Sequence, residues 1–531
     1  MLVLTLFSAI TASGQTPTNE GTVPVSSDTI RQYSCIDAFY NADDYCYYTV
    51  GAVMNAGDSE LAPYYIAANN GGTITQQYSA LVYADIAKYW DKKNRFAWTA
   101  RLNAAGGYTS SAGYERYVGN GQFEVQKQHP ARVWLQQAYL GVKYRSIKMY
   151  VGQACKSSPI VNDGLSSGDL VWSNNARPPV GFRAGFIDFQ DIPFTKGWLQ
   201  LNGEFGYFRQ FDDKWLENHY NYYNQFITTG TWLHYKSLHF RTKPDQPFVF
   251  TIGAQSACQF AGSATYYEDG KVTYSVKMDA DVKAFWRTFI AGSGGNGKGD
   301  SFVEGNHLGT WDIALEYKLK PSEKLRAYTQ WLWEDGSGIG KMNGFDGLWG
   351  LEYSADYSNS LITGAVIEYI DFTNQSGPVH WTPNDRPGTP ITSHSSGADD
   401  YYNNYIYNGY QNRGMSIGSP FVKSPLYNQD GYMRYRDNVL RGFHAAITGK
   451  LNYRWGYTLM GSYRKAWGTP IIPRAGNVDD FSIMLASGYN LYRSWHIKAE
   501  VAMDRGSLYG NNWGAALGIF YNGMFKIKNR R

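Results

Sequence analysis

The 531-residue sequence is poor in charge, in cysteine and in long apolar runs. Charged residues make up only 18% of it, four residues are cysteine, and the mean hydropathy is −0.44. No stretch approaches the run of about 20 apolar residues that a membrane-spanning helix needs, which excludes a helical membrane protein. The formal net charge of +4 is too small to indicate nucleic-acid binding.

Catalytic and metal-binding signatures are also scarce. The segment Gly414-Met-Ser-Ile-Gly418 fits the G-x-S-x-G pattern of a nucleophile elbow. That turn exposes its serine only between a strand and a helix, whereas here it lies in a long polar loop. No CxxC motif and no Cys/His spacing indicates zinc. We therefore expect a protein that is not an enzyme and that holds no cofactor and no metal.

Aromatic residues and long alternating strands are what the sequence has in excess. It contains 44 tyrosines and 17 tryptophans, and membrane barrels use such residues as girdles at both interfaces. In 494–504, apolar residues such as Val501 alternate with charged residues such as Glu500. Because a strand has a period of two residues, the two sets face opposite sides. The same alternation recurs in three further segments: 311–319, 324–334 and 443–453.

Candidate strands of this kind can be placed from residue 61 to the end of the chain. They are expected near 61–68, 81–90, 94–105, 132–144, 146–153, 180–188, 196–210, 229–241, 247–261, 311–319, 324–334, 346–354, 360–371, 441–453, 456–467, 480–492, 494–504 and 511–525. The links between them alternate between short, such as 320–323 and 454–455, and mostly long, such as 262–310 and 372–440. Outer-membrane barrels combine brief periplasmic turns with long extracellular loops in this way. A soluble β-sandwich or propeller explains the strands but not this partition of loop lengths.

We therefore predict an all-β fold, a transmembrane antiparallel β-barrel of about 18 strands in the outer membrane, formed by residues 61–531. Residues 1–14 are predicted to be a signal peptide, because the apolar run Leu2–Ile10 is followed by small residues. Residues 15–60 are expected to form an N-terminal periplasmic segment or a partial plug. Cys35 and Cys46 lie in that segment, and the sequence leaves open whether they form a disulfide in the oxidising periplasm.

The loop 372–440 is rich in tyrosine and asparagine. A flat ring can stack on the apolar face of a sugar, while amides and guanidinium groups can bind its hydroxyls. The alternative is that the loop folds over the barrel mouth and packs on itself, with the tyrosines as its core. Both interpretations remain open at this stage. In the other long loop, 277–290 has the spacing of a short amphipathic helix, which we expect to serve packing.

Several segments resemble the capsule assembly Wzi family in the form found in Bacteroidetes. They are 61–70 (LAPYYIAANN), 173–178 (SNNARP), 191–198 (DIPFTKGW), 234–238 (HYKSL), 305–309 (GNHLG), 334–338 (EDGSG), 346–352 (DGLWGLE), 375–378 (QSGP) and 401–405 (YYNNY). The resemblance implies an 18-stranded outer-membrane lectin that holds exported capsular polysaccharide at the cell surface and is not its export channel. The enterobacterial branch of that family has a helical plug at the periplasmic end. Residues 15–60 show no clear helical period, so the resemblance does not carry that plug over to this chain.

From these observations we predict a lectin that anchors capsular or surface polysaccharide and contacts outer-membrane lipid. The alternatives are a passive porin-type channel for sugars or other solutes and, less directly, an outer-membrane hydrolase that uses Ser416. The predicted polysaccharide-binding residues are Asn306, His307, Trp333, Glu334, Asp335, Tyr401, Tyr402, Asn403, Tyr405 and Arg413.

Overall fold

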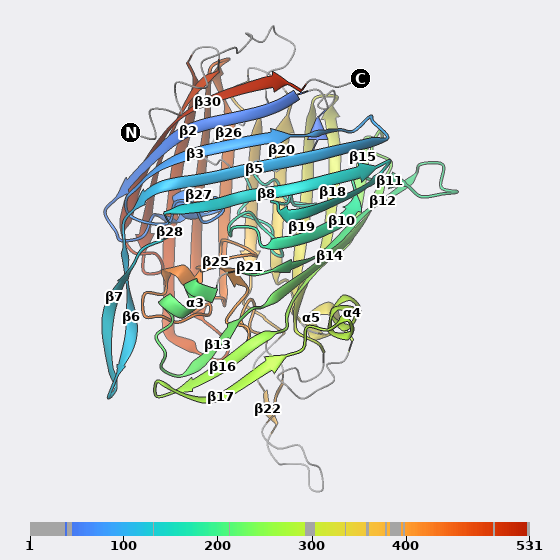
Figure 1. The fold of residues 1–531 in the computed structure, drawn as a ribbon. Coiled ribbons are helices and arrows are strands. Elements are labelled where there is room, and N and C mark those ends of the chain that lie inside the picture. Colours follow the sequence, from blue (N-terminus) through green and yellow to red (C-terminus); the bar gives the residue numbers. More distant parts are fainter. Residues whose placement is uncertain are drawn as a thin grey trace.

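Eighteen antiparallel strands close into one barrel (Figure 1). The computed structural model describes residues 38–39, 45–130, 132–211, 213–292, 303–334, 336–356, 360–376, 380–382, 394–396, 399–491 and 494–527. In order around the barrel the strands are β2 (Tyr45–Gly57), β3 (Ser79–Lys88), β5 (Phe96–Thr109), β8 (Val133–Tyr144), β9 (Ile147–Gln153), β10 (Val180–Phe186), β12 (Leu199–Arg209), β14 (Trp232–Thr242), β15 (Phe248–Phe260), β18 (Asn306–Lys320), β19 (Glu323–Trp333), β20 (Gly347–Ala355), β21 (Gly364–Asp371), β26 (Leu440–Asn452), β27 (Trp455–Gly468), β28 (Pro473–Asn490), β29 (Trp495–Gly506) and β30 (Asn512–Lys526). The ring closes where β30 pairs with β2, from Tyr45 opposite Lys526 to Gly57 opposite Gly514.

The two ends of the barrel differ in their connections. Short turns join the strands at one end, and longer loops with their own helices and strands extend from the other (Figure 1). By the loop-length rule for outer-membrane barrels, the short-turn end faces the periplasm and the other end is extracellular. Exposed aromatic rings gather at the periplasmic strand ends, as expected for an interfacial girdle: Phe96, Tyr144, Trp198, Phe248, Tyr453, Trp455 and Phe525.

The wall separates an apolar outside from a polar inside. In β29, Val501 faces outward and is 57% exposed, whereas Glu500 faces the lumen and is buried. This alternation confirms the predicted all-β transmembrane barrel and its register in that strand. In the described part of the chain, no helix has the length and apolarity to cross a membrane.

The first predicted strand, 61–68, is wrong, and with it the predicted barrel boundary at residue 61. The wall starts with β2, and 61–68 instead enters the barrel as the short helix α2 (Tyr64–Ala67), buried on every side. The alternation in β2 is hard to recognise because small residues such as Gly51 occupy lumenal positions. A Cβ at Gly51 would lie 2.2 Å from the ring of Phe520. The predicted signal peptide, 1–14, lies outside the described residues.

The long loops carry the remaining elements. They are β6 (Ala112–Gly119), β7 (Gln122–Gln128), α3 (Asp213–His219), β13 (Gln225–Thr229), β16 (Gly262–Glu268), β17 (Lys271–Met278), α4 (Val282–Ile290), α5 (Gly336–Ile339), β22 (His380–Thr382), β23 (His394–Ser396), β24 (Gln411–Asn412), β25 (Met415–Ser416) and η2 (Pro425–Tyr427). Three two-residue strands complete the fold: β1 (Ala38–Phe39), which pairs with β4 (Trp90–Asp91), and β11 (Gln190–Asp191), which pairs with β12. Helix α4 confirms the predicted amphipathic helix over 282–290, whereas the first two residues of the predicted range, 277–278, end strand β17.

Candidate functional site

Three extracellular loops fold back into the barrel and form a plug, here defined as 58–78, 154–179 and 399–439. Residues of all three belong to one buried hydrophobic cluster with the lumenal side chains of the wall. The loop 154–179 starts at β9 and reaches β26, which stands half-way around the barrel in the strand order. There the Leu165 carbonyl lies 2.7 Å from Nε2 of His444. This loop therefore spans the lumen from one wall to the other.

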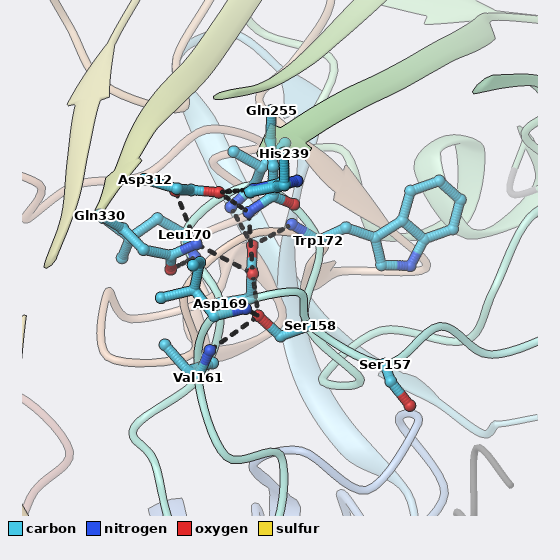
Figure 2. A network of polar contacts seen from close by, with 12 residues as sticks. Ser157, Ser158, Val161, Asp169, Leu170, Trp172, His239, Gln255, Asp312 and Gln330 are labelled. Atoms are coloured by element: carbon cyan, nitrogen blue, oxygen red, sulfur yellow. Dashed lines mark hydrogen bonds and ion pairs between the residues drawn. The ribbon is translucent and has the colours of Figure 1, made fainter. Parts of the chain in front are cut away.

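The centre of loop 154–179 is held by two carboxylates and two amides (Figure 2). Gln255 on β15 donates to Asp169 of the loop at 3.1 Å and to Asp312 on β18 at 3.0 Å. Gln330 on β19 likewise donates to Asp169 at 3.0 Å and to Asp312 at 3.3 Å. Each amide thus uses both of its N–H groups to bridge a loop carboxylate and a wall carboxylate. His239 on β14 contacts Asp312 at 2.8 Å and completes the network.

Asp169 also organises its own loop. Its carboxylate accepts the Ser158 hydroxyl at 2.5 Å and the N–H groups of Val171 and Trp172 at 2.8 and 3.0 Å. Burial favours the neutral acid, but the charge of Lys156 and these hydrogen bonds outweigh it and lower the pKa of Asp169. Asp169 is therefore a buried carboxylate whose oxygens accept hydrogen bonds from several donors. A buried charge needs such partners to be stable.

Two further wall acids bind the same loop. Glu368 on β21 accepts the Ser166 hydroxyl at 2.6 Å and the Ser167 N–H at 2.7 Å. Glu352 on β20 accepts Asn162 at 2.9 Å, and its other oxygen binds Arg326. These acids face the lumen, yet the plug covers them and uses their oxygens. The lumenal charges thus serve as plug anchors.

Tyrosines explain how the loop 399–439 packs inside the barrel without regular secondary structure. The rings of Tyr402 and Tyr410 are buried and nearly parallel, 6.1 Å apart. Their hydroxyls donate to the carbonyls of Leu170 and Val171 in the neighbouring loop, at 2.7 and 2.9 Å. A buried irregular backbone needs partners for its carbonyl groups. Tyrosine supplies an apolar ring and a donor together.

The predicted binding residues Tyr401, Tyr402 and Asn403 belong to this core. Tyr401 is fully buried and its hydroxyl donates to Asp346 at 2.9 Å. Burial raises the pKa of Asp346 to about 6 despite that hydrogen bond. Asn403 is bonded to the backbone of Tyr435 in both directions. None of the three presents a surface to a sugar, so their prediction as polysaccharide ligands is wrong, and the alternative of self-packing describes them.

Of the other predicted residues, His307, Trp333 and Glu334 line one groove at the outer wall, whereas Asn306, Tyr405 and Arg413 do not line it. His307 and Trp333 lie on the outward face of β18 and β19, and Asn306 opposes the lumenal Gln259. Glu334 accepts the N–H of Tyr402 at 2.5 Å and so belongs to the plug, while Arg413 donates to the Phe211 carbonyl at 2.9 Å. Asp335 lies outside the described residues. Of the whole set, only Tyr405 is a largely exposed ring at the extracellular end, with 60% of its surface accessible.

Tyr405 is part of a larger group that we call the outer aromatic surface: Tyr117, Phe123, Tyr223, Tyr266, Tyr274 and Tyr405. One half gathers around Phe226, whose ring lies 5.0 Å from Tyr405, 4.9 Å from Tyr266 and 6.3 Å from Tyr274. In the other half, the rings of Tyr117, Phe123 and Tyr223 contact one another at 5.2–5.5 Å. The Tyr117 hydroxyl donates to Asp269 at the β16–β17 turn, which joins the two halves.

Cationic side chains border this surface. Burial and the neighbouring Tyr266 raise the pKa of Tyr405, while Arg434 acts in the opposite direction, which places its charge within electrostatic range of the exposed ring. The guanidinium groups of Arg434 and Arg436 lie 5.3 and 4.4 Å from the ring centre of Tyr432. Rings beside guanidinium groups can bind a ligand that has both apolar faces and acidic or hydroxyl groups.

Sequence reasoning missed most of this surface, although signals for it exist. The hairpin β6–β7 turns at Asn120-Gly121 and the hairpin β16–β17 at Asp269-Gly270, and all four residues have positive φ. Asn-Gly and Asp-Gly are the dipeptides that favour tight hairpins. They could have divided the long loops 106–131 and 262–310 into projecting hairpins (Figure 1).

The cysteines differ in their bonding. Cys46 is a free thiol, and Cys35, the partner considered for it, lies outside the described residues. The Cys258 thiol contacts the carbonyls of Gln259 and Glu304 at 3.5 Å. Cys155 is engaged in a disulfide. Among the described residues, no group of three His, Cys, Asp or Glu side chains is arranged to hold a metal ion. Ser416 is buried in the plug, where the Asn175 amide donates to its carbonyl at 3.1 Å.

Comparison with known proteins supports the fold. No family model matches the chain. Among solved structures it is similar to Wzi of Escherichia coli, described as an outer membrane protein involved in group 1 capsule assembly and a carbohydrate-binding β-barrel, with a TM-score of 0.53, 13% identity and coverage of 90% of this chain and 84% of that one. Acinetobacter baumannii OccAB2 has a TM-score of 0.44 and 9% identity over 93% and 100% of the two chains. Pseudomonas aeruginosa OprD has a TM-score of 0.41 and 9% identity over 95% of this chain and 100% of that one. The chain is an outer-membrane β-barrel with a Wzi-like fold.

Proposed function

We propose that this barrel is a non-enzymatic carbohydrate-binding protein that holds exported capsular or surface polysaccharide at the cell surface. The observation that carries the proposal is the plug, whose three loops share one buried core inside the barrel. A porin needs a polar lumen filled with water. Here the lumenal acids Asp312, Glu352 and Glu368 are buried and bonded to the plug or its anchoring network. This arrangement favours binding at the mouth over passage through the lumen.

The outer aromatic surface supplies the chemistry that a polysaccharide requires. Tyr274 and Tyr405 are exposed rings that can stack on the apolar faces of sugar units. Arg434 can donate to hydroxyl or acid groups of the polymer, and Arg436, which forms an ion pair with Asp430, has further N–H groups for the same purpose. Binding at one such surface is expected to be weak, because sugar hydroxyls exchange water for protein partners at little net gain. A long polymer that touches many copies of the barrel gains affinity through effective concentration. The carbohydrate-binding description of the similar Wzi barrel supports the same proposal.

The proposal is tested by removing both exposed rings. Tyr274→Ala combined with Tyr405→Ala is expected to weaken binding of the cells' own purified surface polysaccharide. At about 0.5–1.5 kcal/mol for each ring, the combined loss is roughly 5- to 150-fold in Kd. Phe194→Ala is the matched control, because Phe194 is a fully exposed ring in the periplasmic turn before β12.

Conductance distinguishes the proposal from the porin alternative. The wild-type barrel in a planar bilayer is expected to stay silent, and cells that lack it are expected to export polysaccharide but shed it into the medium. A large and steady open current, together with unchanged surface polysaccharide in the deletion strain, contradicts the proposal and identifies a channel.

A further inference from the structure

Helix α4 lies on the outside of the barrel. Its Phe285 ring packs against Tyr207, Trp232 and Phe260 at 4.9–5.2 Å. Leu233 and Phe208 face the lumen, and their chain neighbours Trp232 and Tyr207 therefore face outward. Phe260 is paired with Trp232 and faces the same side. The helix follows β17 at the extracellular end, next to β14 and α5 in Figure 1. It therefore covers the outer wall at the level of the outer leaflet.

The wall beneath α4 is unusually polar for a lipid-facing surface. His234, Lys236, Cys258 and His307 occupy neighbouring outward positions on β14, β15 and β18. The helix supplies partners for this patch, since Lys236 donates to the Phe289 carbonyl. The Tyr207 hydroxyl likewise donates to the Phe285 carbonyl at 2.8 Å. These hydrogen bonds fix α4 on the wall.

The opposite face of α4 is apolar and exposed. Val282, Trp286 and Ile290 follow one another at intervals of four residues, and 86%, 61% and 52% of their surfaces are accessible. Three large apolar side chains in one stripe are costly in water. A short helix with an apolar outer stripe and a tryptophan is suited to the boundary between lipid head groups and acyl chains.

A groove of about 1070 Å³ opens on the wall below this helix. Its lining includes residues of the four wall strands β12, β14, β15 and β18 and of the helices α4 and α5: Phe205, Leu238, Ala254, Trp311, Phe289 and Ile339. Helix α5 is tied to the same wall, because the Trp311 indole donates to the Ile339 carbonyl at 3.3 Å. This volume lies just above the range of ordinary ligand sites, roughly 300–1,000 Å³. The lining is mostly apolar, and its polar members include Lys236, His307 and Glu334.

We infer that this groove is a binding site for an acyl chain of an outer-leaflet lipid, with α4 and α5 as its walls. The groove is continuous with the lipid-facing surface, since Phe205, Leu238 and Trp311 are also exposed on the outer wall. An acyl chain has the chemistry that matches the apolar part of this lining. A lipid bound in this groove is expected to stay with the protein when detergent extracts it from the membrane, whereas bulk lipid is removed. The groove shares no residue with the outer aromatic surface, although His307, Trp333 and Glu334 of the residues predicted from the sequence line it.

The test fills the groove and counts the lipid that remains bound. Full-length protein is reconstituted in vesicles of phosphatidylcholine with one acyl-chain length, extracted into mild detergent and examined by native mass spectrometry. Wild type is expected to retain a lipid mass increment. Ala254→Phe and Ala184→Phe, which place a ring in the groove from two different strands, are expected to lose it. The matched control is Ala445→Phe, on the outward face of β26 away from the groove, which is expected to keep it.

Each result bears on the inference. Heat-modifiability on gels identifies the variants that have folded, and either groove variant suffices. Retention of lipid by a folded groove variant, loss of lipid in Ala445→Phe, or no retained lipid in wild type would each overturn the acyl-chain site. Loss confined to the groove variants establishes it.

Discussion

In the barrel wall each strand is held along its length by the backbones of its two neighbours. In the plug, loop 154–179 is held to the wall at a few points, by individual side chains such as Asp169 and His444. Strand β29, for example, pairs along its length with β28 and β30. Loop 154–179 depends on Asp169, Leu165 and a few hydroxyl and amide contacts. The difference predicts that one substitution can release the plug while the wall stays closed.

Asp169→Ala is expected to have the largest effect on the plug. It removes the acceptor for the Ser158 hydroxyl and for the N–H groups of Val171 and Trp172. Leaving a buried donor without a partner costs about 1–3 kcal/mol for each of them, and Asp312 loses its bridge to the loop. We expect conductance to appear in planar bilayers while the barrel remains heat-modifiable on gels.

The control for that variant is Asp188→Ala. Asp188 lies in a periplasmic turn and forms an exposed ion pair with Lys92 at 3.4 Å. Exposed ion pairs contribute little to the stability of a fold. This change should leave the barrel silent. Equal conductance in both variants, or none in either, would show that the Asp169 network does not hold the plug.

Val501→Arg tests the wall in the same way. It places a charge on the lipid face of β29, which costs roughly 2–4 kcal/mol near the bilayer midplane. We expect a lower fraction of heat-modifiable barrel and no conductance from the molecules that fold. Glu500→Gln, one residue away on the lumenal face, should fold almost normally because an amide retains hydrogen-bonding capacity. If Glu500→Gln instead gave the lower fraction of heat-modifiable barrel, the register of β29 would be wrong by one residue.

The wall could be predicted because its pattern is local. The alternation of Val501 with Glu500 is visible in adjacent residues, and the link lengths are visible without any tertiary information. Strand β2 was not predicted because Gly51, Ala52 and Ala56 weaken the difference in hydrophobicity between its two faces. Small residues there are required by contact with the neighbouring strand, as Gly51 is by Phe520.

The plug could not be predicted because its contacts are distant in sequence. Gln255 lies 86 residues from Asp169, and Gln330 lies 161 residues from it. No period or motif marks such partners. For the same reason the sequence could not tell which tyrosines of 372–440 form a core and which face water. Tyr401 is buried and Tyr405 is exposed although they lie in the same short motif.

That contrast supplies the smallest and most closely matched test, Tyr401→Phe against Tyr405→Phe. The first substitution removes a hydroxyl that donates to Asp346 and accepts from the Asn343 amide, both at 2.9 Å. A hydrogen bond to a charged group contributes about 1.5–3 kcal/mol, so loop 399–439 should become more sensitive to limited proteolysis in intact, folded barrels. The second substitution keeps the exposed ring and removes only its hydroxyl, which lies outside the buried core of the plug. It should therefore change neither proteolysis nor polysaccharide binding by stacking. If Tyr405→Phe instead abolishes polysaccharide binding, the ligand is recognised through hydrogen bonds to tyrosine hydroxyls and not through the ring faces. If Tyr401→Phe leaves proteolysis unchanged, the loop is held by its apolar core alone, and the distinction between a wall of repeated contacts and a plug of single contacts no longer applies to it.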